Sequence, residues 1–110
     1  MARDPGLEDL IRADLRRDLA LTEKAMFGGL AWLLDGNLLV GARGDGMLVR
    51  LGKGNDAWAL ALPDVGPMIS AGRPMDGWVR AGPAAYGDDG VRARLIEAAF
   101  MFVKGLPPKG

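Results

Sequence analysis

The chain of 110 residues contains no cysteine and no histidine. Without cysteine it can form no disulfide and has no thiolate to act as a nucleophile or metal ligand. Without histidine it lacks the usual zinc ligand and the usual general base near neutral pH. A metal would have to be held by carboxylates alone, and the sequence shows no compact group of them. We therefore expect neither a metal nor another cofactor.

Hydroxyl nucleophiles are also scarce, since the chain has one serine, one threonine and one tyrosine, Ser70, Thr22 and Tyr86. None of them has a histidine base, and none lies in a G-x-S-x-G turn. The glycine-rich segments 41–46 and 52–54 do not open a long helix after a parallel strand, so we interpret them as turns rather than phosphate-binding loops. We expect no catalytic residues and no enzymatic activity.

The net charge is zero, because 14 basic residues balance 14 acidic ones. The field that draws proteins to nucleic acid or to anionic membranes is therefore missing, and we do not expect nucleic acid as a partner. The charged start, residues 1–10, is not typical of a secretory signal, and no apolar run approaches the ~20 residues of a membrane span. We expect a cytoplasmic protein with no membrane contact.

A length of 110 residues with 49% hydrophobic residues predicts one domain, residues 1–110, with a single core. Between Met26 and Leu51, three apolar runs are separated by Asp35-Gly36 and by the segment 44–46. Asp-Gly between strand-like runs is a strong hairpin signal, because a tight turn needs positive φ. The pattern predicts a three-stranded antiparallel meander from about Lys24 to Leu51, with a bulge, a bend or a close backbone approach at Gly28-Gly29.

After the meander, the pattern predicts a short helix over 55–62, a short edge strand around 68–69 and a fifth strand around 78–80. Apolar residues at helical spacing predict a first helix over 6–19. This helix places Asp14 and Asp18 close to its apolar stripe, where an unpaired carboxylate is costly. We favour a partly wet edge or pairing with an arginine from the sheet, and a polar cleft is the alternative.

The clearest element is a last helix over 90–104, which begins after a capping aspartate at 88 or 89 and ends at Gly105. Its apolar arc covers nearly half of the circumference, which is more than one contact surface needs. Either other parts of the chain cover the second flank, which we favour, or Ile96 and Phe100 contact another subunit. We expect five residues to be mainly buried: Phe27, Trp32, Val49, Leu95 and Phe102.

Arg43, Arg50, Arg73 and Arg80 all fall on or beside predicted strands. On one face of the sheet they could hold an anion or an acidic partner. Ordinary surface ion pairs, with Asp14, Asp18 and Asp76 among the partners, are the favoured interpretation. The three tryptophans, Trp32, Trp58 and Trp78, are better explained by core packing than by stacking on a ligand.

Several fragments in a fixed order resemble a known family: Met26-Phe27-Gly28-Gly29, the Asp35-Gly36 turn, Arg73-Pro74-Met75 with Gly77-Trp78-Val79, and Leu106-Pro107-Pro108-Lys109. They are similar to the TfoX N-terminal domain of the TfoX/Sxy family in its single-domain form, over about Thr22 to Lys109. The resemblance implies a two-layer α+β fold, helix-β(3)-helix-β(2)-helix on one antiparallel sheet, similar to secretion chaperones. This element order agrees with the order predicted from the residues.

Two-domain members of that family regulate natural competence and carry a second, helical domain. The chain ends directly after the Leu106–Lys109 fragment, so we expect no such domain here and do not extend competence regulation to it. The family supplies no established catalytic residues.

Three functions are consistent with these observations. The first is a non-catalytic regulatory or interaction domain that binds a protein partner, or itself as a homodimer, through the sheet edge or the last helix. The second is a nucleic-acid accessory that uses the four arginines. The third is a small-molecule sensor or enzyme with a pocket between the last helix and the sheet, near Trp78 and Arg73.

Overall fold

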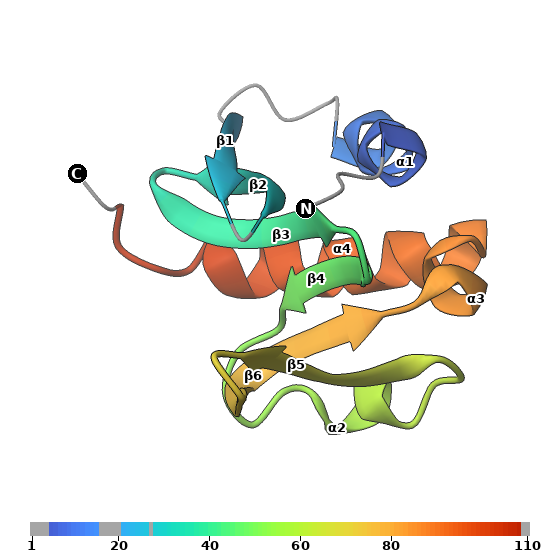
Figure 1. Cartoon of the computed structure of the whole chain (residues 1–110). Helices are drawn as coiled ribbons and strands as arrows, with labels where there is room; N and C mark the ends of the chain where they lie inside the picture. Colours follow the sequence, from blue (N-terminus) through green and yellow to red (C-terminus); the bar gives the residue numbers. More distant parts are fainter. Residues whose placement is uncertain (1–4, 16–20, 27, 109–110) are drawn as a thin grey trace.

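The computed structural model describes residues 5–15, 21–26 and 28–108, and within them it shows one six-stranded sheet and four helices (Figure 1). The helices are α1 (Pro5–Leu15), α2 (Ala57–Leu60), α3 (Pro83–Tyr86) and α4 (Asp89–Val103). The strands are β1 (Leu21–Met26), β2 (Gly29–Leu34), β3 (Asn37–Arg43), β4 (Gly46–Arg50), β5 (Val65–Ser70) and β6 (Arg73–Ala81). The predicted α+β fold on an antiparallel sheet is confirmed.

The strand order across the sheet is β1-β2-β3-β4-β6-β5, and every neighbouring pair is antiparallel. Strands β1 to β4 follow one another as a meander. The chain then passes through α2 to β5 at the far edge, and β6 returns between β5 and β4 (Figure 1). The predicted edge strand around Met68 is thus confirmed as β5.

Of the three alternatives at Gly28-Gly29, the close backbone approach is confirmed and the bulge is wrong, because the chain turns there and divides the predicted first strand into β1 and β2. Met26 pairs with Gly29 across the β1–β2 hairpin, and Gly28 adopts a left-handed φ of 73°. Gly29 lies so close to β3 that a Cβ atom would collide with the carbonyl oxygen of Ala42. The turn contains no Asp-Gly pair, so it lacks the strongest short-range hairpin signal. Phe27, predicted to be buried, lies outside the described residues.

The other predicted turns are present. Asp35 and Gly36 have φ values of 52° and 83° and connect β2 to β3, as a type I′ turn requires. The last helix is confirmed within one residue at each end, and the Asp88 carboxylate caps it by accepting a hydrogen bond from the Val91 amide at 3.0 Å. The helix predicted over 55–62 is shorter, α3 was not predicted, and residues 16–19 of the first predicted helix lie outside the described residues.

The sheet has two faces with different cover. On the first, which we call the covered face, side chains of all four described helices pack with inward residues of the strands, including Leu7, Trp32, Val49 and Leu95. On the second, which we call the open face, the described residues form a smaller cluster that contains strand residues alone: Leu48, Met68 and Trp78, with Leu38 at its margin. Helix α4 lies behind β3 and β4 in Figure 1.

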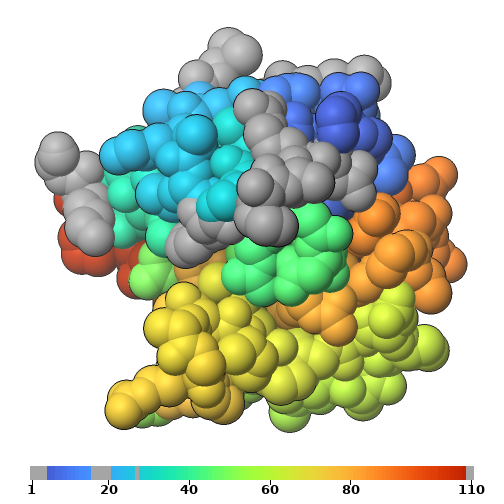
Figure 2. All heavy atoms as spheres, viewed as in Figure 1, coloured from blue at the N-terminus to red at the C-terminus, as the bar shows by residue number. Residues whose placement is uncertain are grey.

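Figure 2 views the sheet from its open side, and the coloured atoms near its centre belong largely to strands, whereas those of helices α1, α3 and α4 are seen at the margins. Of the predicted core residues, Trp32, Val49 and Leu95 are buried as expected. Phe102 is partly exposed at the end of α4, although its ring still packs against the main core.

Helix α1 is joined to α4 by an ion pair. The Arg92 side chain, 6% exposed, donates hydrogen bonds to Asp14 (2.9 Å), to Asp89 (3.0 Å) and to the Tyr86 carbonyl oxygen (2.8 Å). Burial by itself would lower the pKa of Arg92, but the hydrogen bonds to Asp14 and Asp89 outweigh it and raise that pKa. The arginine predicted to pair with Asp14 therefore comes from α4 and not from the sheet, and Asp18 lies outside the described residues.

A second polar group joins α1 to the strands. Arg12 donates to both carboxylate oxygens of Glu23 on β1 at 2.7 and 3.1 Å, and the Trp32 indole donates to the same carboxylate at 3.0 Å. The hydrogen bond with Glu23 raises the pKa of Arg12. The guanidinium also lies 6.0 Å from the centre of the Trp32 ring. Polar contacts thus fix the position of α1 over the first hairpin.

Candidate interaction groove

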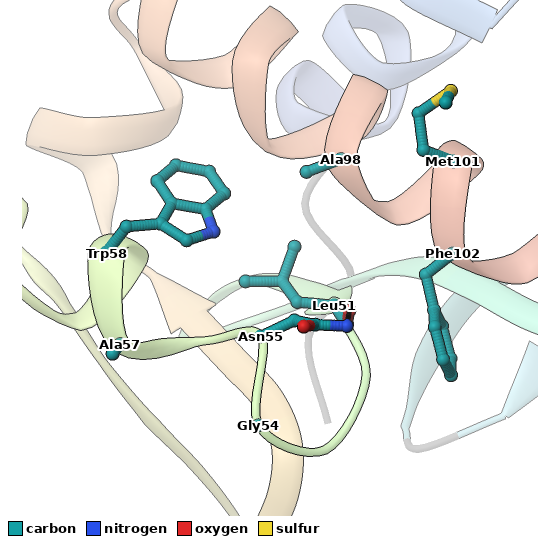
Figure 3. Close-up of a pocket in the computed structure, with 8 residues that line it drawn as sticks. All are labelled: Leu51, Gly54, Asn55, Ala57, Trp58, Ala98, Met101 and Phe102. Carbon is teal, nitrogen blue, oxygen red and sulfur yellow. Dashed lines mark hydrogen bonds between the residues drawn. The ribbon is translucent and has the colours of Figure 1, made fainter.

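An open groove of about 800 Å³ lies between α2, the loop 52–55 and α4 (Figure 3). It is lined by Leu51, Gly54, Asn55, Ala57, Trp58, Ala98, Met101 and Phe102. The lining is mostly apolar, and its polar groups are the Asn55 amide and the indole N–H of Trp58. Figure 3 shows Trp58 extending from α2 toward α4, with Leu51 on the floor between them.

One end of the groove is formed by the Phe102 ring, which lies directly on the backbone of Gly52. A Cβ atom on Gly52 would come within 2.6 Å of Cδ1 of this ring, and Gly52 has a left-handed φ of 99°. Gly77 on β6 holds Gly52 in place, because its carbonyl oxygen accepts hydrogen bonds from the amides of Leu51 (2.7 Å) and Gly52 (3.1 Å). The Arg50 guanidinium lies 5.7 Å from the centre of the Phe102 ring.

The other wall is Trp58, whose ring is held by a cation. The Arg94 guanidinium on α4 lies 4.4 Å from the centre of this ring, close enough for a cation–π contact. This contact connects the four-residue helix α2 to α4 across the groove. Trp58 is thus partly buried against the main core, as predicted, and also presents a surface to the groove.

Exposed apolar side chains lie in or near this region. Met101 is 54% exposed on α4, and Leu60, at the end of α2, is 39% exposed. Asn55 uses its amide nitrogen to donate to the Leu51 carbonyl oxygen at 3.4 Å. An open, aromatic-walled groove with a flexible Met at its rim suits an apolar segment of another protein better than a small polar molecule.

Three of the predicted arginines lie on the open face, and each bonds within the chain. Arg43 donates to the Asp45 carboxylate at 2.6 Å, Arg80 donates to the Asp45 carbonyl oxygen at 2.8 Å, and Arg50 donates to the Leu38 carbonyl oxygen at 3.3 Å. The hydrogen bond from Arg43 lowers the pKa of Asp45. These contacts use part of the donor capacity that an anion would need.

Arg73 does not join the other three. It lies exposed at the start of β6, where it pairs with Ser70, whereas Trp78 pairs with Arg50 at the middle of the sheet. Trp78 packs on the open face with Leu48 and Met68, on the other side of the sheet from α4. The predicted pocket between the last helix and the sheet is therefore not bordered by Trp78 and Arg73 together.

The two predicted interface residues of α4 have different surroundings. Ile96 is 5% exposed and belongs to the main core, so it offers almost no surface to a second copy. Phe100 is partly exposed, with the Lys104 ammonium 5.7 Å from the centre of its ring. The broad apolar arc is thus explained within the chain at Ile96 and only in part at Phe100.

The groove was not predicted from the sequence, although Trp58 and the segment 52–54 were singled out. Its signal is the pair of glycines at 52 and 77, which are distant in sequence and meet only in the folded chain. Among the described residues, no three acidic side chains gather closely enough to hold a metal ion. None of the helices within those residues has the length and apolarity needed to cross a bilayer.

Comparison with models of protein families matches residues 15–103 to the TfoX N-terminal domain. This match covers most of the 110 residues and confirms the resemblance carried by the sequence fragments. No curated protein gives a significant match. No solved structure gives one either.

Proposed function

The chain belongs to the TfoX N-terminal domain family, and we propose that it is a non-catalytic regulatory domain that binds a protein partner through the groove between α2 and α4. The family suggests a regulatory domain. The observation that carries the proposal is the aromatic-walled groove with Met101 exposed at its rim. The partner would insert one or more apolar side chains between Trp58 and Phe102.

The rigid walls of the groove support this proposal. Phe102 packs against Gly52 and Arg50, and Trp58 packs against Arg94, so both rings have neighbours within the chain that favour their positions before a partner binds. Preorganised aromatic rings lose little conformational entropy on binding and dominate the energetics of many interfaces. The groove is also open to solvent along one side, as a peptide segment requires.

The distribution of polar groups supports a role without catalysis. Three carboxylates are engaged in ion pairs, Asp14 with Arg92, Glu23 with Arg12 and Asp45 with Arg43. The side chains that line the groove offer no group that titrates near neutral pH. General acid or base catalysis would need such a group close to the bound substrate.

The experiment that tests the proposal compares two single-residue variants as affinity baits in extracts of the source cell. Ala57→Glu places a charge on an exposed residue of the groove lining, while Ala61→Glu places the same charge just beyond α2, outside the lining. We expect a protein that binds the wild type and Ala61→Glu but is lost with Ala57→Glu. Its direct binding is then measured by calorimetry with both purified proteins.

The proposed binding through the groove would be wrong if every captured protein bound Ala57→Glu as well as Ala61→Glu while both variants kept the wild-type melting temperature. A purified wild-type protein that turned over a substrate would contradict the non-catalytic part of the proposal. Loss of binding with Trp58→Ala, checked for folding by circular dichroism, would further place the contact at the aromatic wall.

A further inference from the structure

Helix α4 carries a second exposed stripe beside the groove, and Met101 belongs to both. Glu97, Met101 and Lys104 are exposed and Phe100 is partly exposed. Residues separated by three, four or seven positions lie on the same side of an α-helix. These four side chains therefore form one stripe along the last two turns of α4, and Figure 3 shows Met101 and Phe102 pointing to opposite sides of the helix.

The order of residues along this stripe is complementary to itself. Within these four residues the anion Glu97 comes first and the cation Lys104 last, with the apolar pair Phe100 and Met101 between them. Arg94, three positions before Glu97, is directed to the Trp58 ring. When two such helices run antiparallel about an axis midway between residues 100 and 101, each Glu97 lies level with Lys104 of the second copy. In the same arrangement, each Phe100 lies level with Met101 of the second copy.

We propose that two copies of this chain associate through this stripe, with their α4 helices antiparallel and with reciprocal Glu97–Lys104 pairs on either side of a Phe100 and Met101 contact. In a two-fold interface both copies use the same surface, so that surface must be complementary to itself. The stripe satisfies this condition, because each charge lies level with the opposite charge of the second copy. Opposite charges at this spacing also fix the orientation, since parallel helices would place Glu97 against Glu97.

This arrangement differs from the interface predicted from the sequence. Ile96 is buried in the core of its own chain, so the contact is centred on the outward stripe and retains Phe100 from the earlier prediction. The contact involves one pair of helices, and interfaces of small area tend to be weak and transient. We therefore expect a reversible dimer that forms as the protein concentration rises.

Charge-reversal variants test the proposal. Glu97→Lys and Lys104→Glu each place like charges opposite one another in both reciprocal pairs. The double variant makes both pairs attractive again, with the two charges exchanged. Sedimentation equilibrium over a concentration series measures the monomer mass of 11.6 kDa against twice that mass. We expect each single variant to weaken association by about tenfold or more, and the double variant to return to the wild-type value.

A mixture of the two single variants sharpens the test. The mixed dimer has both pairs attractive, so an equimolar mixture should associate more strongly than either variant alone. Glu97 and Lys104 are exposed, so these changes should leave the melting temperature nearly unchanged.

Three results would overturn the proposal. A wild-type protein that stays monomeric throughout the concentration series excludes this dimer. Single variants that associate as well as the wild type place any dimer elsewhere on the molecule. A double variant or a mixture that fails to recover association, with the fold intact, excludes the antiparallel register. The groove variants Ala57→Glu and Ala61→Glu keep the stripe, so this test can fail while the proposed function stands.

Discussion

The covered face and the open face of the sheet differ in what buries their apolar residues. On the covered face, Leu95 and Val49 are fully buried between strands and helices in a cluster to which all four described helices contribute. On the open face, Leu48 is equally buried, although the residues of its cluster within the described part of the chain all come from strands. Leu48 is paired with Arg80 on the neighbouring strand β6. The aliphatic part of an arginine side chain can cover apolar surface while its charged end reaches solvent.

This difference teaches that equal burial does not imply equal packing. A residue between a helix and a sheet is surrounded by rigid groups, so removing its side chain leaves a cavity that cannot close. A residue under long charged side chains has neighbours that can move into the vacated space. The two faces should therefore respond differently to the same substitution.

The largest effect should come from comparing Leu95→Ala with Leu48→Ala, since both leucines are fully buried and the removed atoms are the same. We expect Leu95→Ala to cost about 4 kcal/mol and Leu48→Ala about 2 kcal/mol, in the upper and lower parts of the range for such changes. Urea denaturation measures both free energies of unfolding. Equal losses would show that the open face is packed as rigidly as the covered face.

The sequence predicted the covered face better than the open one. The periodicity of α4 and the capping aspartate depend on local spacing, and both were predicted correctly. Met68 and Trp78 were placed on strands, but their meeting with Leu48 depends on β6 being inserted between β4 and β5. Such insertion is a long-range property that no local pattern records.

The site was harder to predict for the same physical reason. The groove depends on contact between Gly52 and Gly77, which lie 25 positions apart and meet through backbone hydrogen bonds. A glycine in a sequence indicates a turn or a close approach, but not which segment approaches it. The sequence placed the four arginines near strands but could not identify their partners. Arg50 and Arg80 donate to the carbonyl oxygens of Leu38 and Asp45, which come close to them only in the folded chain.

The second-largest effect should come from the contact between Gly77 on β6 and Gly52 in the loop of the groove. Gly77→Ala should destabilise the fold by about 2 kcal/mol or more, because Gly77 has a φ of 82° and a Cβ atom would lie 2.6 Å from the Gly52 carbonyl carbon. Gly72→Ala is the matched control, since its φ is 79° and nothing lies within 4 Å of the added atom. We expect the control to cost only about 1 kcal/mol, from the backbone strain alone.

Thermal denaturation of both glycine variants, followed by circular dichroism, gives the comparison. The difference between them reports the steric contact with Gly52, apart from the strain of positive φ. If the two variants lost the same stability, the close approach of β6 to the loop would not constrain the fold.

A smaller effect concerns the polar joint on the covered face. Asp14→Asn removes the charge that faces the buried Arg92, and we expect a loss of about 1 to 2 kcal/mol because the guanidinium loses its best-shielded partner. Asp89→Asn removes a partner that is 89% exposed, and should change stability by less than about 0.5 kcal/mol. Chemical denaturation at neutral pH measures both, and the reverse ranking would mean that α1 is not held through Arg92.

The smallest effect lies on the open face, at the ion pair between Arg43 and Asp45. The hydrogen bond from Arg43 lowers the pKa of Asp45 from its ordinary value of 3.8, so the folded state binds this proton more weakly than the unfolded chain does. The resulting stability is fully present above that ordinary value and is lost as the pH falls through the lower pKa of the folded state. Asp45 is 53% exposed, so solvent screens the pair and we expect it to contribute about 0.5 kcal/mol or less.

The measurement compares the free energies of unfolding of the wild type and Asp45→Asn between about pH 6 and pH 2, the range over which carboxylates titrate. The two free energies should converge slightly at the acidic end. A gap that instead widened toward low pH would show that the Arg43 contact does not stabilise the folded state, and that the open face depends on its apolar cluster alone.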